Sequence, residues 1–387
     1  MFKIQTLNKI ASAGLDKLPH DNYETASEIN NPDAIMVRSA KLHEMEFPES
    51  LKSIARAGAG VNNIPVDKCS EKGIVVFNTP GANANGVKEI VLAGMLLASR
   101  GIVEGIGYVN TLKGKGEEVS KIVEKNKKNY AGNEIKGKKL GLIGLGAIGS
   151  LVANSAIALG MEVEGYDPFI SVDAAWSLSS EVKKARGLED LISSSDYLSL
   201  HLPVNDKTKG FLNSDKFALM KNGVKIMNFA RGGLVNDKDL IAALKEGKVS
   251  KYVTDFITDE LIGVENVIGI PHLGASTAES EENCSVMAAD QLKDFLENGN
   301  ILNSVNFPNC TLDRCGDSRI AIINKNIPNM VGQITSVLAD SGINIIEMLN
   351  KSKGDFAYNI LDIEGDVSGE PIEKLSVIEG VIKVRLI

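Results

Sequence analysis

Short apolar runs rich in β-branched residues recur along most of the chain, and segments with helical spacing separate them. The runs cover residues 34–37, 53–57, 74–77, 140–143, 162–166, 197–200, 225–228, 252–254 and 267–270. One helical segment is 238–245, in which Leu240, Ile241 and Leu244 share a face. The runs do not alternate in polarity, as expected of strands buried on both faces. The pattern predicts an α/β fold with doubly wound parallel sheets.

Two changes in this pattern predict the domain boundaries. Residues 117–137 are polar and rich in lysine, so we expect a surface excursion between two sets of α/β units. Residues 308–317 contain Pro308 and Gly316 and few apolar residues, which predicts a linker. We therefore expect four parts, namely a first α/β domain of 1–98 plus 276–307, a second of 99–275, the linker, and a C-terminal domain of 318–387. The last has the strand and helix order βαββαβ, which is ferredoxin-like.

Composition narrows the class of protein. The chain has 387 residues, of which 43% are hydrophobic and 24% charged, as in ordinary globular proteins of two or three domains. A net charge of −8 argues against non-specific binding to nucleic acid. The longest apolar stretch, near 90–98, is short against the ~20 residues of a membrane span. Four cysteines indicate reduced thiols and a cytoplasmic protein, and Cys310 and Cys315 lack the further ligands of a metal site.

A glycine-rich turn follows the predicted strand at 140–143. Gly144 permits a tight turn, Gly146 lets the backbone approach a pyrophosphate, and Gly149 lets the next helix pack closely. Asp167 ends the following strand, where a carboxylate accepts the ribose hydroxyls of NAD and repels the 2′-phosphate of NADP. The alternative is a turn in a cofactor-free domain. The context favours a Rossmann-like NAD-binding domain over 99–275, with the following loop residues at the cofactor: Gly144, Gly146, Ala147, Ile148, Gly149 and Asp167.

Three polar segments, 228–236, 255–260 and 271–277, each follow a predicted strand. They should therefore meet at the carboxyl edge of one sheet, where ligands bind in this architecture. They carry Arg231, Asp255, Asp259, Glu260 and His272. A histidine can take a hydroxyl proton near neutral pH, and an arginine can hold a carboxylate through two hydrogen bonds. With NAD, these groups suit hydride transfer to or from a 2-hydroxy acid, although His272 could also be a structural histidine at a strand end.

On these motifs the chain resembles the D-isomer-specific 2-hydroxyacid dehydrogenases over nearly its whole length. The resemblance implies that Arg231 binds the substrate carboxylate, that His272 is the acid–base and that Asp255 holds the nicotinamide amide. It implies Glu260 as the partner of His272, but Asp259 adjoins it and Leu261 stands where many members have proline, so either acid remains a candidate. The other cofactor-lining residues that the resemblance implies are His201, Pro203, Thr208, Ala230, His272 and Gly274.

The resemblance also implies a substrate-binding role for the first α/β domain. Arg38 and Ser39 would bind a phosphate, and backbone N–H groups of 58–62 would bind the carboxylate. The full substrate set is Arg38, Ser39, Arg56, Ala59, Gly60, Val61, Asn62 and Arg231. Lys88 either supplies charge to the phosphate or faces solvent, and we favour solvent.

The implied reaction is the NAD-dependent oxidation of 3-phospho-D-glycerate to 3-phosphohydroxypyruvate, the first step of the phosphorylated serine pathway. One alternative is a reductase of another 2-oxo acid, such as hydroxypyruvate, glyoxylate or 2-oxoglutarate. Another is a non-enzymatic NAD-sensing protein, against which the set of Arg231, Glu260 and His272 argues.

The C-terminal domain resembles an ACT domain, a small regulatory module that often binds amino acids. Asn324, Asn326 and Asn344 lie in the matching turns, and the resemblance implies L-serine as the effector. The alternative is a module that only dimerises. A homodimer or homotetramer is the assembly that the family resemblance implies.

Overall fold

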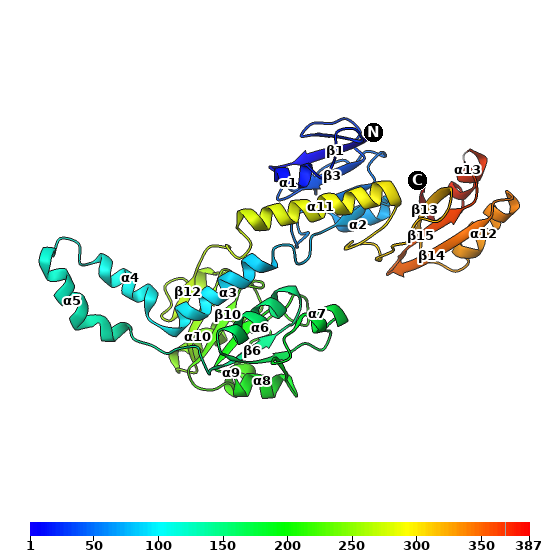
Figure 1. Ribbon diagram of the computed structural model, residues 1–387. Helices are drawn as coiled ribbons and strands as arrows, with labels where there is room; N and C mark the ends of the chain where they lie inside the picture. The colour runs from blue at the N-terminus through cyan, green and yellow to red at the C-terminus, as the bar shows by residue number, and fades with distance from the viewer. Residues whose placement is uncertain (368) are drawn as a thin grey trace. The chain divides into compact units, whose positions relative to one another are not determined.

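The computed structural model describes residues 1–367 and 369–387. The chain divides into two compact units, one of Met1–Asn83 with Ala278–Ile387 and one of Ala84–Thr277. Two parallel sheets and a C-terminal antiparallel sheet form the α/β fold (Figure 1), which confirms the predicted fold class.

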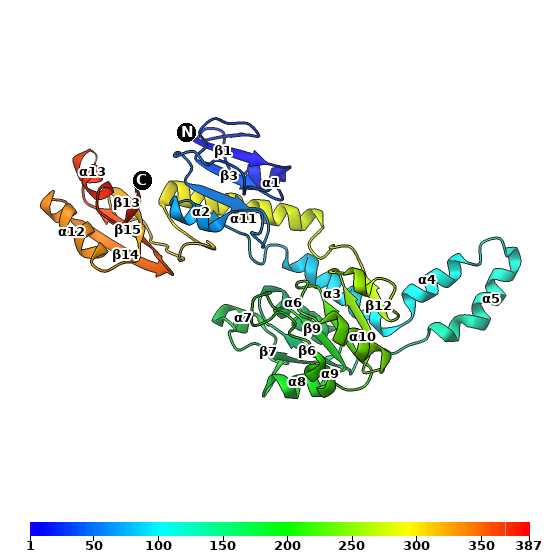
Figure 2. The same cartoon turned by 180° about the vertical axis from the view of Figure 1, so that it is seen from behind.

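The second unit is built on a seven-stranded parallel sheet with the order β12-β11-β10-β9-β6-β7-β8. Its strands are β6 (Lys139–Ile143), β7 (Glu162–Tyr166), β8 (Lys183–Lys184), β9 (Tyr197–Leu200), β10 (Val224–Asn228), β11 (Val249–Thr254) and β12 (Val267–Gly269). Its helices include α6 (Ala147–Ala158), α7 (Val172–Ser177), α8 (Leu188–Ser194), α9 (Ser214–Leu219) and α10 (Asp237–Lys245). Helix α6 covers one face, while α8, α9 and α10 cover the other (Figure 2). Burial on both faces explains the continuous apolar runs.

Helix α3 (Ala84–Ser99) belongs to this unit, whereas the sequence pattern assigns it to the first α/β domain. Val87, Val91 and Met95 lie in the same apolar core as Val152 of α6, so the boundary falls near residue 83 instead of 98. A core of this kind fixes a helix to the sheet that its apolar stripe covers.

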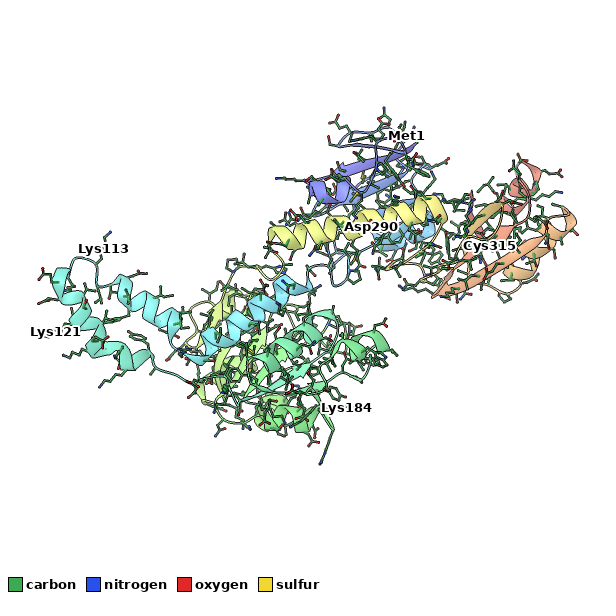
Figure 3. All side chains as sticks on the ribbon, in the orientation of Figure 1. Met1, Lys113, Lys121, Lys184, Asp290 and Cys315 are labelled. Carbon is green, nitrogen blue, oxygen red and sulfur yellow. The ribbon has the colours of Figure 1, made fainter. Side chains whose placement is uncertain are left out.

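A helical arm follows α3, where the sequence predicts a surface excursion. It consists of α4 (Ile102–Asn110), η1 (Gly116–Glu118), α5 (Val119–Asn126) and η2 (Lys127–Tyr130). The arm projects away from the rest of its unit (Figure 1), with Lys113 and Lys121 marking its outer part (Figure 3). No single helix in the described chain is long and apolar enough to cross a membrane, although α3 and α4 together pass that test as a pair bent by 71°.

The first unit contains a five-stranded parallel sheet with the order β2-β1-β3-β4-β5. The strands are β1 (Phe2–Leu7), β2 (Tyr23–Ala26), β3 (Ala34–Val37), β4 (Ser53–Arg56) and β5 (Val75–Phe77), with helices α1 (Ser12–Leu15), α2 (Val66–Glu71) and α11 (Ala278–Asn298). The sequence pattern does not single out β1 or β2, because polar residues interrupt both. Helix α11 lies along this sheet (Figure 1), and its Leu292 and Phe295 share a core with Met36 and Phe77.

The C-terminal sheet has the antiparallel order β14-β15-β13-β16. Its elements are β13 (Ser318–Lys325), α12 (Met330–Asp340), β14 (Ile345–Lys353), β15 (Phe356–Ile363), α13 (Glu370–Ser376) and β16 (Val381–Leu386), in the βαββαβ order expected from the sequence. Part of the predicted linker is ordered and packed, because Cys310 is buried and pairs with Ile301 through two backbone hydrogen bonds. Asp362 holds this segment through the backbone N–H of Cys315, labelled in Figure 3.

Candidate active site

The glycine-rich turn between β6 and α6 requires its glycines. Gly144 has φ +96°, and a Cβ there would lie 2.4 Å from the carbonyl oxygen of His201. A Cβ on Gly149 would lie 2.2 Å from the carbonyl oxygen of Gly144, so both positions exclude any larger residue. A Cβ on Gly146 would meet no atom within 4 Å. The backbone at Gly146 is therefore open to a ligand at the amino end of α6, which suits a pyrophosphate.

Asp167 lies beside this turn at the end of β7. Its Oδ2 accepts a hydrogen bond from the backbone N–H of Leu145 (2.8 Å), and its Oδ1 accepts one from that of Phe169 (2.9 Å). Two backbone donors hold the carboxylate in one orientation next to the turn. This placement fits recognition of a ribose by an acid in the second strand of a dinucleotide-binding unit.

His201 follows β9 and lies under the glycine turn. The residue is half-buried, and desolvation of the imidazole lowers its pKa to about 4, so the ring is neutral at physiological pH. Its Nε2 lies 3.0 Å from the hydroxyl of Ser199. Further along, the Thr208 hydroxyl donates to the carbonyl of Pro203 (2.6 Å) and fixes the loop. His201 can therefore line a cofactor site, and it cannot supply a positive charge there.

Asp255 ends β11 with a side chain that is only 4% exposed. Its Oδ2 accepts a hydrogen bond from the backbone N–H of Gly274 (3.0 Å), while its buried Oδ1 has no hydrogen-bond partner in the described structure. Burial raises the pKa of this carboxyl, and the Gly274 hydrogen bond and the charges of His272 and Arg231 offset part of that rise. An unpaired buried acceptor fits an amide donor such as that of a nicotinamide.

Arg231 is exposed in the turn after β10. Its Nη1 donates to the carbonyl of Ala230 (2.6 Å). Asn228, only 2% exposed, donates from Nδ2 to the carbonyl of Arg231 (3.0 Å) and to the hydroxyl of Tyr252 (3.2 Å). Sequence reasoning assigned no role to Asn228, although a buried asparagine at a strand end is the signal that could have found it. It shapes the turn that presents the guanidinium.

His272 follows β12 and is exposed, with its ring 4.5 Å from the ring of Phe256, centroid to centroid. Glu260 lies in the short helix η3 (Asp259–Leu261) and is also exposed. Within residues 1–367 and 369–387, neither Glu260 nor Asp259 makes a hydrogen bond or salt bridge to His272. Arg231, Asp255 and His272 thus follow the neighbouring parallel strands β10, β11 and β12 at one edge of the sheet, while Glu260 is not bonded to the imidazole in the described structure.

The predicted substrate residues of the first unit are held by internal contacts. Arg38 Nη2 donates to Glu281 Oε1 of α11 at 2.5 Å. The Arg56 guanidinium donates from Nε to the carbonyl of Arg38 (3.0 Å) and from Nη1 to that of Gly60. The backbone N–H of Ser39 donates to Asn8 Oδ1 (3.0 Å). Sequence reasoning missed Glu281, although an acid in the first turn of a helix that follows the polar segment 271–277 was a usable signal.

The loop from Ala59 to Asn62 follows β4, where the sequence places it. The carbonyl of Ala59 accepts a hydrogen bond from Asn78 Nδ2 (2.6 Å), and that of Val61 accepts one from the backbone N–H of Ile64 (3.0 Å). Lys88, which we expected to face solvent, has a side chain only 17% exposed and pairs with Glu89 (3.6 Å) in the second unit. Its aliphatic stem is covered by the protein.

In the C-terminal module the three asparagines occupy different environments. Asn324 is 1% exposed, and its Oδ1 accepts from Asn359 Nδ2 at 2.7 Å. Asn326 and Asn344 are exposed and donate to the carbonyl of Gly354 (3.1 Å) and to Glu364 Oε2 (3.0 Å). The buried amide is engaged within the sheet, so Asn326 and Asn344 are the accessible members of the set.

Comparisons with known proteins show which family the chain belongs to. Residues 92–274 match the family model of the D-isomer specific 2-hydroxyacid dehydrogenase NAD binding domain. The chain is 31% identical over 401 residues to the D-3-phosphoglycerate dehydrogenase of Haemophilus influenzae, covering 99% of this chain and 94% of the relative. It is 35% identical over 335 residues to that of Methanocaldococcus jannaschii, covering 84% of this chain but only 61% of that longer relative.

A solved structure with bound cofactor has a similar fold. The NAD+-bound 3-phosphoglycerate dehydrogenase of Entamoeba histolytica superposes with a TM-score of 0.62 at 28% sequence identity. The match covers 79% of this chain and 98% of that one.

Proposed function

Because the chain belongs to the D-isomer-specific 2-hydroxyacid dehydrogenase family, we propose that it oxidises 3-phospho-D-glycerate to 3-phosphohydroxypyruvate with NAD, the first step of serine synthesis by the phosphorylated route. The observation that carries the proposal is that Arg231, Asp255 and His272 follow the neighbouring parallel strands β10, β11 and β12, at the same edge of the sheet as the glycine turn after β6. The similarity to named D-3-phosphoglycerate dehydrogenases over most of the chain supports this substrate.

The residues of the second unit fit NAD. Gly146 leaves room for the pyrophosphate, Asp167 suits the ribose, and the unpaired Oδ1 of Asp255 suits the nicotinamide amide. Ala147, Ile148, His201, Pro203, Thr208, Ala230 and Gly274 complete the proposed lining. A bound NAD would supply the hydride-acceptor chemistry of the reaction.

The protein's own groups supply the proton transfer and the orientation. The His272 imidazole takes the hydroxyl proton, and Arg231 holds the carboxylate through charge-assisted hydrogen bonds. Asp255 follows the neighbouring strand β11, and the charge of His272 offsets part of the rise that burial causes in the pKa of its carboxyl. Glu260 is the proposed direct partner of His272, since catalytic hydrogen bonds often form only once the ligands are bound. Arg38 and Ser39 would bind the phosphate.

A substrate panel tests the proposal. NADH formation is measured by absorbance with 3-phosphoglycerate, D-glycerate, D-lactate and 2-hydroxyglutarate, and the reverse reaction with hydroxypyruvate and glyoxylate. We expect the highest kcat/KM for 3-phosphoglycerate. A higher value for an unphosphorylated acid would replace this function with that of another 2-oxo acid reductase, and no turnover at all would favour an NAD-sensing protein.

We also propose that the protein forms a homodimer through its helical arm. Ile106 and Val109 of α4 are 58% and 48% exposed, and a cavity of about 440 Å³ between α4 and the end of the arm is lined mainly by apolar atoms. Exposed apolar side chains of this density are typical of a surface that another chain covers. Replacing Ile106 with Asp should convert the dimer to a monomer in sedimentation velocity, and an unchanged dimer would refute the role of the arm.

Serine is the effector that we propose for the C-terminal module. Asn326 lies beside the turn between β14 and β15, and Asn344 lies at the opposite end of the same sheet, before β14. Exposed side-chain amides of this kind can bind an amino acid through its charged groups. Turnover measured with and without L-serine tests this. An unaltered rate at high serine concentration would leave the module without this role.

A further inference from the structure

Arg38, which follows β3, forms a salt bridge with an acidic residue of its own unit. Arg38 Nη2 lies 2.5 Å from Glu281 Oε1, and both side chains are 42% exposed. Glu281 lies in the first turn of α11, and the buried Cys284 follows about one turn later. Burial raises the pKa of the Cys284 thiol, and the charges of Arg56 and Arg38 offset part of that rise. The pair is thus part of a small cluster of charges at the carboxyl edge of the five-stranded sheet.

The two arginines of this cluster differ in what they could offer an incoming anion. Arg56 makes hydrogen bonds to two backbone carbonyls, of Arg38 and Gly60, which tie the loops after β3 and β4 together. Among the residues that the structure describes, the Arg38 side chain donates a hydrogen bond only to the carboxylate of Glu281. A ligand can bind the Arg38 guanidinium by displacing the Glu281 side chain. Binding to the Arg56 guanidinium would instead break its hydrogen bonds to the backbone of both loops.

We propose that Glu281 is a specificity-determining residue, an internal anion that occupies Arg38 in the empty protein and is displaced by the phosphate of the substrate. The inference rests on the proposed function, because it names Arg38 as the phosphate-binding group. A phosphate dianion offers three acceptor oxygens and binds a guanidinium with two hydrogen bonds, so it can replace a carboxylate that holds one. A carboxylate ligand carries only a single negative charge, so it gains less than a phosphate dianion does by displacing Glu281.

This exchange has two consequences for catalysis. Part of the attraction between Arg38 and the phosphate is used to break the internal pair, which raises KM for the phosphorylated acid. The same pair keeps weak monovalent anions away from Arg38. Exposed ion pairs of this kind contribute little free energy, so removing the charge of Glu281 should change the affinity for the phosphorylated acid by only about two- to fivefold.

The test compares Glu281→Gln with a matched control, Glu282→Gln. Glu281 lies in the first turn of α11 and Glu282 is the next residue, so both substitutions remove one negative charge near the positive end of the helix dipole. Glu282 is exposed and forms no salt bridge with any residue that the structure describes. Glutamine at 281 keeps an oxygen that can orient Arg38 but removes the competing charge.

We expect E281Q to lower KM for 3-phosphoglycerate about two- to fivefold, with KM for D-glycerate and kcat unchanged, and E282Q to behave as the parent protein. In an Arg38→Gln background, E281Q should have no effect on KM. A higher KM for 3-phosphoglycerate in E281Q, or an equal change for both substrates, would overturn the proposal, because Glu281 would then assist binding or act through the fold.

A binding measurement separates this inference from the proposed reaction. Inorganic phosphate is titrated into the full chain by calorimetry, without any turnover. Tighter phosphate binding by E281Q than by the parent and by E282Q supports the internal anion even if 3-phosphoglycerate is not oxidised. Equal or weaker binding by E281Q refutes it, even if the proposed reaction is correct.

Discussion

The carboxyl edges of the two parallel sheets both carry polar loops, but they differ in whether the proposed binding groups already have hydrogen-bond partners within the protein. At the edge of the seven-stranded sheet, Asp255 keeps an unpaired acceptor and Gly146 an open backbone. At the edge of the five-stranded sheet, Arg38 and Arg56 already have partners within their own unit. One edge is preorganised for a ligand, while the other must exchange an internal contact for it.

The difference has a physical cause in burial. Asp255 is almost fully covered and is fixed by the backbone N–H of Gly274, so its orientation does not depend on a ligand. Arg38 is long and 42% exposed, and an unpaired guanidinium there would have many rotamers. The ion pair with Glu281 restricts it. Preorganisation through the backbone therefore suits the cofactor edge, and a displaceable side chain suits the substrate edge.

The largest expected effect is that of His272→Ala, which removes the proposed acid–base from the preorganised edge. We expect kcat to fall about 10²- to 10⁴-fold, because a positioned general base contributes on this order. The NAD dissociation constant, measured by fluorescence titration, should stay within about twofold, since Asp255 and the glycine turn remain. Turnover close to that of the parent protein would remove His272 from the mechanism.

Asp255→Asn should have the next largest effect, on NAD affinity. The amide can still accept from the N–H of Gly274, but it places an NH₂ group where the unpaired Oδ1 lies. Losing a hydrogen bond to a charged acceptor corresponds to roughly 10- to 100-fold weaker NAD binding. Phosphate affinity, which depends on the other unit, should not change. Unaltered NAD affinity would show that Oδ1 does not face the cofactor.

The same substitution has a pH signature in the free protein. Burial raises the pKa of Asp255, so the folded protein binds a proton there more readily than the unfolded chain does. Ionisation of this carboxyl therefore lowers the free energy of unfolding as the pH rises from the pKa of the unfolded chain through the higher pKa of the folded protein. Asp255→Asn should raise the unfolding temperature at neutral pH, and the gain should disappear at a pH low enough to protonate the carboxyl. A gain that is independent of pH would contradict this account.

The sequence predicts the binding residues at the edge of the seven-stranded sheet better than the contacts at the edge of the five-stranded sheet. Gly144 is required by its own positive φ and Gly149 by its contact with the carbonyl of Gly144, both within a single strand–turn–helix unit, and the motif contains that information. The contact of Arg38 with Glu281 joins residues 243 positions apart, and no local pattern encodes it. The placement of α3 fails for a similar reason: its apolar stripe shows that it is buried, but not which sheet covers it.

The smallest expected effect is that of Arg56→Lys, which tests whether the substrate edge depends on backbone ties. A lysine cannot reach the carbonyls of Arg38 and Gly60 together, because its ammonium is a single point and the guanidinium is a planar fork. The loss of one net hydrogen bond, on the order of 1 kcal/mol, predicts about a fivefold higher KM for 3-phosphoglycerate with little change in kcat. Arg38→Lys serves as the comparison. We expect it to raise KM for phosphorylated substrates alone, whereas Arg56→Lys should also raise KM for D-glycerate. If Arg56→Lys instead lowered kcat as far as His272→Ala does, Arg56 would contact the reacting substrate itself, and the contrast between the two edges would fail at this residue.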